Sequence, residues 1–71
     1  MMTKAEQVEK TFTYHAPKGD QIERYVLLRE IMKSASLAVV EMTPESREQS
    51  TALTKLQEAV MWANAAIAIN E

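Results

Sequence analysis

The residues best suited to holding a small ligand gather in the stretch FTYHAPKGDQ, at positions 12–21. It contains two aromatics, Phe12 and Tyr14, with the only histidine, His15, the only glycine and one of two prolines. Alternate side chains of an extended segment project from the same side, so both aromatic rings would face one way and His15 the other. Pro17 would stiffen that segment, and the glycine would permit a sharp turn into a following helix.

A row of polar and cationic side chains follows this stretch at helical spacing. Gln21, Tyr25 and Arg29 lie four residues apart, and Lys33 follows at the next such position. Aromatic faces stack on nucleobases and Arg or Lys groups bind phosphates, so the combination is typical of a nucleotide site. The alternative is structural: the two aromatics would clamp the arm onto the helices, and the cations would be solvated.

A second candidate anion site lies in PESREQSTALT, at positions 44–54. Arg47, Ser50, Thr51 and Thr54 would fall on adjacent turns near the positive end of a helix dipole. Copies of this cluster around a symmetry axis would multiply the charge. The alternative is an ordinary helix start with capping hydroxyls.

These residues must be positioned by helices, and the chain of 71 residues is long enough for one domain, 1–71. We expect an all-α antiparallel hairpin: a polar segment 1–11, a pocket-lip loop 12–19, and helices over 20–42 and 45–70. Asp20 would cap the first long helix, with Glu23 completing a capping box. Thr43 would cap the second, with Pro44 at its first position.

The apolar pattern exceeds what a hairpin can bury. One stripe of the second long helix is regular and consists of Leu53, Leu56, Val60, Ala63 and Ile67. The first would contribute Ile22, Tyr25, Met32, Ala35, Val39 and Met42. Further apolar residues, among them Met61, Trp62 and Ile69, lie outside these stripes. Because large exposed apolar patches are uncommon on monomers, we expect a homo-oligomer.

Composition argues against several classes of function. The chain has no cysteine and one histidine, which argues against disulfides and a zinc site and fits a reducing cytoplasm. The net charge of −2 does not suit a DNA-binding protein. No apolar run approaches the ~20 residues that cross a membrane. Neither a phosphate loop nor a nucleophile–base pair is present, so we expect no enzyme, no cofactor and no metal.

Two segments together, FTYHAPKGDQIERYVLLRE and SREQSTALTKLQEAVMWANAAIAIN, resemble the small phage anti-CBASS sponge proteins that sequester cyclic oligonucleotides. The family includes a hairpin domain shared with anti-Thoeris sponges. The resemblance covers positions 12 to about 70. It implies a helical homohexamer that binds 3′,3′-cyclic GMP-AMP and related cyclic dinucleotides between protomers, and cyclic trinucleotides at separate sites. The ligand would be held uncleaved, in the cytoplasm of the infected bacterium, and defence effectors would stay inactive.

Residue roles follow from the resemblance. Tyr14 would stack on a base, His15 and Pro17 would shape the pocket wall, and Arg29 or Lys33 would meet phosphate. The full cyclic dinucleotide set is Phe12, Tyr14, His15, Pro17, Lys18, Gln21, Arg29 and Lys33. The cyclic trinucleotide set is Arg47, Ser50, Thr51 and Thr54. The alternative function is that of a helical-hairpin interaction protein docking onto a host protein.

Overall fold

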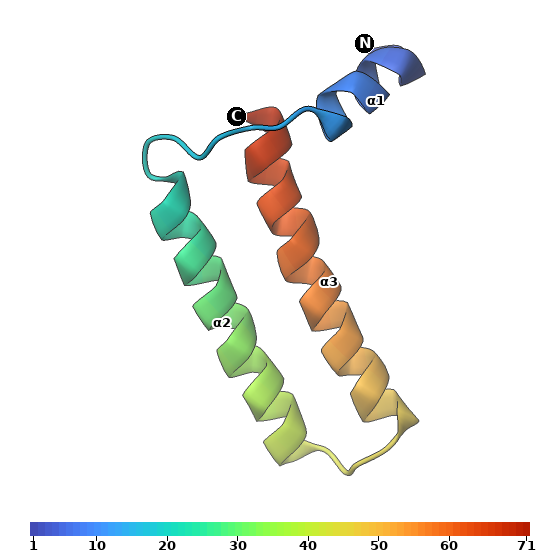
Figure 1. The fold of residues 1–71 in the computed structure, drawn as a ribbon. Coiled ribbons are helices and arrows are strands. Elements are labelled where there is room, and N and C mark those ends of the chain that lie inside the picture. The colour runs from blue at the N-terminus through green and yellow to red at the C-terminus, as the bar shows by residue number, and fades with distance from the viewer.

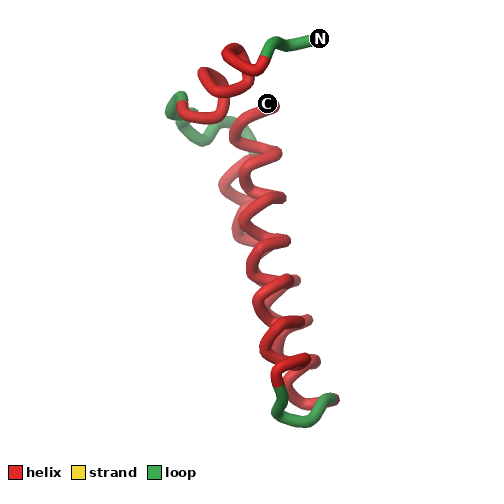
Figure 2. The backbone as a smooth tube through the Cα atoms, turned by 90° about the vertical axis from the view of Figure 1, so that its right-hand side faces the viewer, coloured by secondary structure: helices red, strands yellow, loops and turns green.

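The computed structural model describes all 71 residues as three helices joined by two connections, with no strand. Helix α1 spans Lys4–Phe12, α2 spans Gln21–Met42 and α3 spans Arg47–Asn70. Helices α2 and α3 lie side by side and antiparallel, while α1 projects from the open end of the hairpin (Figure 1). The molecule is elongated, 44 × 28 × 18 Å, and Figure 2 shows the hairpin edge-on. The expected all-α hairpin is therefore confirmed.

The polar N-terminal segment, in which the sequence suggests at most a marginal helix, forms helix α1. Thr3 and Glu6 make a reciprocal capping box, in which each residue's backbone N–H donates to the other's side chain at 3.1 Å. The two hydrogen bonds from Thr3, through its backbone and then its side chain, lower the pKa of Glu6. The helix continues through Phe12, so this ring is not part of an extended lip as expected.

The two long helices begin differently from the expectation. Asp20 makes no side-chain cap bond; its carboxylate instead accepts from Arg24 Nε at 3.2 Å. Helix α3 is capped by Ser46, whose Oγ accepts from the Gln49 N–H at 3.1 Å. Thr43 was expected to cap α3 but ends α2, because its N–H and hydroxyl both donate to the Val39 carbonyl, at 3.1 and 2.6 Å. The second long helix thus begins two residues after the predicted start.

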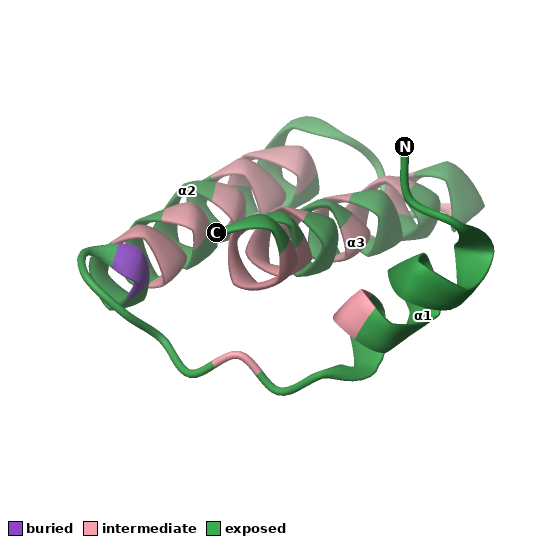
Figure 3. Cartoon of the chain, turned by 90° about the horizontal axis from the view of Figure 1, so that it is seen from above, coloured by how far each residue is buried: buried purple, intermediate pink, exposed green.

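The seam between α2 and α3 is apolar but thin. The five predicted stripe residues of α3 are all half-buried, and α2 presents Tyr25, Leu28, Met32, Ala35 and Val39. Ile22 and Met42, which were expected in this stripe, are 61% and 80% exposed because they lie at the ends and sides of the seam. The only buried residue is Gln21, which is 4% exposed. Figure 3 shows the one buried stretch, in purple, at the end of α2 next to the α1–α2 connection.

A single pair of helices cannot surround a side chain, so no hydrophobic residue is fully buried. Large apolar side chains remain exposed along the outer surfaces of both long helices. They are Ile22, Val26, Leu27, Ile31, Leu37, Val40, Met42, Met61 and Trp62. This exposed area is the structural basis for expecting further copies of the chain, since monomers rarely expose extended apolar patches.

Candidate functional site

The connection between α1 and α2 is held against the open end of the hairpin by hydrogen bonds. Gln21 links the connection to the end of α3. Its Oε1 accepts from the Lys18 N–H at 3.0 Å, and its Nε2 donates to Glu71 at 3.3 Å. On the other side, Lys10 Nζ donates to Asn70 Oδ1 at 3.2 Å. A partly open cavity of about 190 Å³ lies at this end of the hairpin. Its lining residues are His15, Ala16, Lys18, Gln21, Ala68 and Glu71.

An ion pair that the sequence analysis did not find closes the same end. Both Arg24 terminal nitrogens donate to the Glu71 carboxylate, one of them at 2.8 Å. The hydrogen bonds from Arg24 and then Gln21 lower the pKa of Glu71 to about 2, and the pKa of Arg24 is raised in turn, chiefly by Glu71. The pair joins residues 47 positions apart, so no local spacing could have revealed it. Arg24 is consequently occupied by carboxylates and poorly placed for phosphate.

The aromatic candidates at the end of α1 and in the following connection make few contacts with the hairpin. Phe12 and Tyr14 are each 83% exposed, so neither clamps the arm to the hairpin. His15 is half-buried, with Nε2 lying 3.1 Å from the Lys10 carbonyl oxygen. Because a carbonyl only accepts, Nε2 must carry a proton here. The remaining ring nitrogen, Nδ1, is the one available to a ligand.

The cations expected to bind phosphate lie in a groove at the middle of the hairpin. Arg29 and Lys33, one turn apart on α2, line a cavity of about 220 Å³. Its other lining residues are Met32, Ser36, Leu56, Gln57 and Val60. No acidic residue lines this groove, and neither cation forms a salt bridge. The groove is therefore an uncompensated positive site with an apolar floor.

Within one chain, the groove and the connection do not form one cavity. Gln21 and Arg29 are eight residues apart on α2, or roughly 12 Å along the helix axis. The structure thus groups His15, Lys18 and Gln21 at the open end and Arg29 with Lys33 farther along. Phe12, Tyr14 and Pro17 are exposed and line neither cavity.

The second predicted cluster is only partly assembled. Arg47 and Thr51 line an open depression of about 350 Å³ near the start of α3, together with Glu48. The Thr51 hydroxyl donates to the Arg47 carbonyl at 2.9 Å. Ser50 and Thr54 are exposed outside this depression. In one copy, the Glu48 carboxylate partly offsets the single guanidinium.

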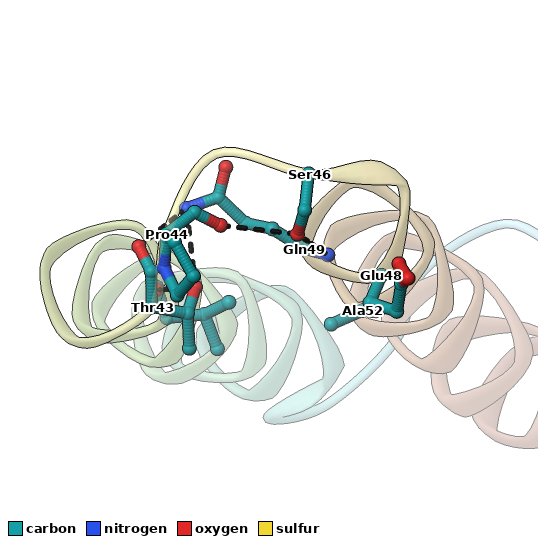
Figure 4. Close-up of a pocket in the computed structure, with 7 residues that line it drawn as sticks. Thr43, Pro44, Ser46, Glu48, Gln49 and Ala52 are labelled. Carbon is teal, nitrogen blue, oxygen red and sulfur yellow. Dashed lines mark hydrogen bonds between the residues drawn. The ribbon is translucent and has the colours of Figure 1, made fainter.

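The most spacious cavity, about 460 Å³, lies at the α2–α3 turn (Figure 4). Gln49 crosses the turn, where its Nε2 donates to the Thr43 carbonyl and Thr43 Oγ1, both at 3.1 Å. The only charged lining residue is Glu48, and the remainder are Val39, Thr43, Pro44, Ser46, Gln49 and Ala52. An acidic and otherwise uncharged lining does not suit a phosphate-bearing ligand, so size alone does not identify the site.

No three His, Cys, Asp or Glu residues lie close enough together to hold a metal ion. None of the helices combines the length and the apolar character needed to cross a bilayer.

Comparison with known proteins places the chain in a family. Residues 4–68 match the Acb2/Tad1 hairpin domain. No curated protein and no solved structure matches significantly. The match covers all of α1 and α2 and all but the last two residues of α3. The chain therefore belongs to the Acb2/Tad1 hairpin-domain family, the family of anti-CBASS and anti-Thoeris sponge proteins.

Proposed function

We propose that this protein binds 3′,3′-cyclic GMP-AMP and related cyclic dinucleotides and holds them uncleaved between neighbouring copies of itself. In the cytoplasm of an infected bacterium, this would deprive CBASS effectors of their activator. Membership of the family by itself implies a sponge-type phage anti-defence role, performed by a binding domain rather than an enzyme. The observation that carries the ligand assignment is the Arg29–Lys33 groove, which is cationic, free of carboxylates and floored by apolar side chains.

The volume of the groove supports a shared site. Small-molecule sites usually enclose about 300–1,000 Å³, and the groove of one copy offers about 220 Å³. Tyr14, the expected stacking ring, is 83% exposed and lies in the connection rather than in the groove. A second copy that brings its own Tyr14 against this groove would supply both the missing wall and the stacking surface. The exposed apolar surface of both long helices supports such an assembly, which we expect to be a homohexamer.

The interactions available are strong enough for sequestration. Stacking contributes about 1–3 kcal/mol per base, and each charge-assisted hydrogen bond to phosphate about 1.5–3 kcal/mol. Two bases and two phosphates thus give a gross gain of about 5–12 kcal/mol, against which the cost of association must be set. Affinity then depends on how far the pocket is preformed by the assembly.

We also propose a separate site for cyclic trinucleotides at Arg47, with Ser50, Thr51 or Thr54 contributing hydroxyls. One copy supplies a single guanidinium beside Glu48, so three copies around an axis would be needed to match three phosphates. Arg47→Ala should then weaken trinucleotide binding and leave dinucleotide binding unchanged. Equal loss of both ligands would contradict two separate sites.

The dinucleotide proposal is tested by calorimetric titration with 3′,3′-cyclic GMP-AMP. Arg29→Ala should weaken binding about 10- to 150-fold, the equivalent of one lost charged hydrogen bond. Lys55→Ala is the matched control, because Lys55 pairs with Glu58 at 3.5 Å, outside the groove. Absence of heat with every cyclic nucleotide would refute the proposal and favour the alternative, a hairpin that docks onto a host protein.

Two further measurements test whether the ligand stays intact and whether Tyr14 contacts the ligand. Ligand recovered from the complex by heat denaturation should be chemically unchanged, whereas linear dinucleotide would indicate an enzyme. Tyr14→Ala should abolish dinucleotide binding while sedimentation still shows the wild-type assembly. Dissociation of the assembly would instead mean that Tyr14 is a structural contact.

A further inference from the structure

The side-chain amide of Gln21 lies between two partners that permit only one orientation. Its Nε2 donates to the Glu71 carboxylate at 3.3 Å, and its Oε1 accepts from the Lys18 N–H at 3.0 Å. An ionised carboxylate only accepts hydrogen bonds, and a backbone N–H only donates. If the amide turned over, its oxygen would face the carboxylate and its nitrogen would face the N–H. The acceptor at position 71 therefore selects the orientation in which the Lys18 N–H is bonded.

The Glu71 carboxylate is itself held in place and kept ionised. The Glu71 N–H donates to the Ile67 carbonyl at 3.2 Å, so the residue continues the hydrogen bonding of α3. Both terminal nitrogens of Arg24 donate to the carboxylate, one of them at 2.8 Å. These bonds, and then the one from Gln21, lower the pKa of Glu71 to about 2, so the group is an acceptor at neutral pH. Arg24 thus fixes the carboxylate, and the carboxylate fixes the amide.

The bond to the Lys18 N–H restrains the segment that carries Tyr14. Immediately before Lys18, Pro17 has a fixed φ and also restricts the residue that precedes it. The ring of His15 is bonded to the Lys10 carbonyl, with 3.1 Å between nitrogen and oxygen. Few backbone dihedrals are therefore free between Lys18 and Tyr14, so fixing one end of this segment fixes its course.

The connection would be loosely joined to α2 without this bond. Gly19 follows Lys18 with a φ of +58° and with open space around the position of a Cβ, so other conformations are open to it. On the other side of Tyr14, Lys10 donates to Asn70 Oδ1 at 3.2 Å. The last two residues of α3 thus hold the connection on both sides of Tyr14, one directly and the other through Gln21.

We propose that Glu71 is a positioning residue of the dinucleotide site: by accepting from Gln21 it orients the amide that holds the Lys18 N–H, and so fixes the segment that carries Tyr14. The proposal rests on the proposed function, in which Tyr14 is the stacking ring. Glu71 acts through Gln21 and not on the ligand, because its carboxylate is paired with Arg24 and carries the same sign as phosphate. A segment that is already fixed need not be ordered when the ligand binds, which favours affinity.

An exchange of charges separates the orientation of the amide from the ion pair. Arg24→Glu/Glu71→Lys keeps opposite charges at the two positions, but the new ammonium only donates. The oxygen of Gln21 should then turn toward position 71 and leave Nε2 facing the Lys18 N–H, donor against donor. Adding Gln21→Glu supplies a carboxylate that accepts from both sides and should restore the bond. The matched control is Lys55→Glu/Glu58→Lys, which exchanges a 3.5 Å ion pair elsewhere on α3.

Amide hydrogen exchange at Lys18, followed by NMR without ligand, measures the bond directly. Loss of one hydrogen bond should make this exchange about 2- to 12-fold faster in Arg24→Glu/Glu71→Lys. In calorimetry with 3′,3′-cyclic GMP-AMP, Kd should rise by about the same factor, because fewer chains have the segment in place. The triple variant and the control should match wild type in both measurements. A purely structural ion pair predicts no change in the exchanged pair, whose charges still attract.

The two measurements separate the parts of the proposal. Unchanged hydrogen exchange at Lys18 in Arg24→Glu/Glu71→Lys, or failure of Gln21→Glu to restore it, would overturn the orienting role. Faster exchange with an unchanged Kd would overturn the role in the ligand site. If wild type binds no cyclic dinucleotide, the proposed function and the role in its site both fail, while exchange at Lys18 still decides whether Glu71 orients the amide.

Folding of the variants is checked by circular dichroism. Arg24 and Glu71 have partly exposed side chains, so we expect the exchanged pair to keep the hairpin. If it loses its helices, Arg24→Gln/Glu71→Lys places the same donor at position 71 without a new carboxylate and is read by the same criteria.

Discussion

Replacement of Gln21 by alanine tests whether this residue binds ligand or holds the fold. The side chain is 4% exposed, and both of its hydrogen bonds are internal, to the Lys18 N–H and to Glu71. A hydrogen bond contributes about 0.5–1.5 kcal/mol to stability, so the two together contribute about 1–3 kcal/mol. For a domain of this size each kcal/mol corresponds to about 4–8 °C in Tm, which predicts a loss of roughly 4–24 °C.

Thermal unfolding followed by circular dichroism at fixed protein concentration measures this loss. Gln7→Ala is the matched control, because Gln7 is exposed, lies in α1 and makes no side-chain hydrogen bond, so its Tm should change little. If Gln21→Ala left Tm unchanged while reducing dinucleotide affinity, Gln21 would be a ligand contact. The role assigned to it in holding the connection would then be wrong.

Three further outcomes follow from the caps and polar contacts. Ser46→Ala removes the α3 cap and should cost about 1 kcal/mol in chemical denaturation, whereas a smaller loss at Ser46 than at Thr43 would mean that the cap is misassigned. Asn64→Leu should be neutral or stabilising, because the buried Asn64 Oδ1 has no hydrogen-bond partner; a large loss would reveal one. The pKa of Glu71 is about 2 rather than the ordinary 4.5, so its stabilising contribution is present above pH 4.5 and is lost as the pH falls toward 2; Tm of wild type and Glu71→Gln should therefore converge across that range.

Long-range regularities of the fold were predictable from sequence because they depend on periodicity. The α3 stripe from Leu53 to Ile67 was predicted residue by residue, since a long run at 3.6-residue spacing has only one face to bury. The antiparallel arrangement followed from the short connection between the two long helices. These features are determined by many residues acting together, so one misjudged position does not alter them.

The first and last residues of the helices were less predictable, because a few hydrogen bonds determine where each helix begins and ends. Thr43 and Ser46 are both good N-cap residues. Only the structure shows that Thr43 donates its hydrogen bonds to the Val39 carbonyl of the preceding helix. Phe12 was expected in an extended lip, but the Thr3–Glu6 capping box starts a helix that includes it. The Thr3-x-x-Glu6 spacing was present in the sequence and could have indicated this helix.

The candidate site was predictable as a set of residue types and not as a geometry. Arg29 and Lys33 do share a groove, because one turn of α2 separates them. Gln21 was grouped with them on the same row, yet its amide is buried in contacts with Lys18 and Glu71. Sequence spacing alone does not distinguish a side chain that faces solvent from one that is buried in hydrogen bonds within the chain.

Gly19 adopts a φ of +58°, the one left-handed backbone conformation in the chain, and open space surrounds the position where a Cβ would lie. Glycine is therefore favoured at position 19 by the positive φ, and not by any lack of space for a side chain. A chain of 71 residues is within reach of total chemical synthesis, so the two mirror-image alanines can be compared there. D-alanine, which favours positive φ, should be tolerated, whereas L-alanine should be strained and should redirect the segment that carries Tyr14.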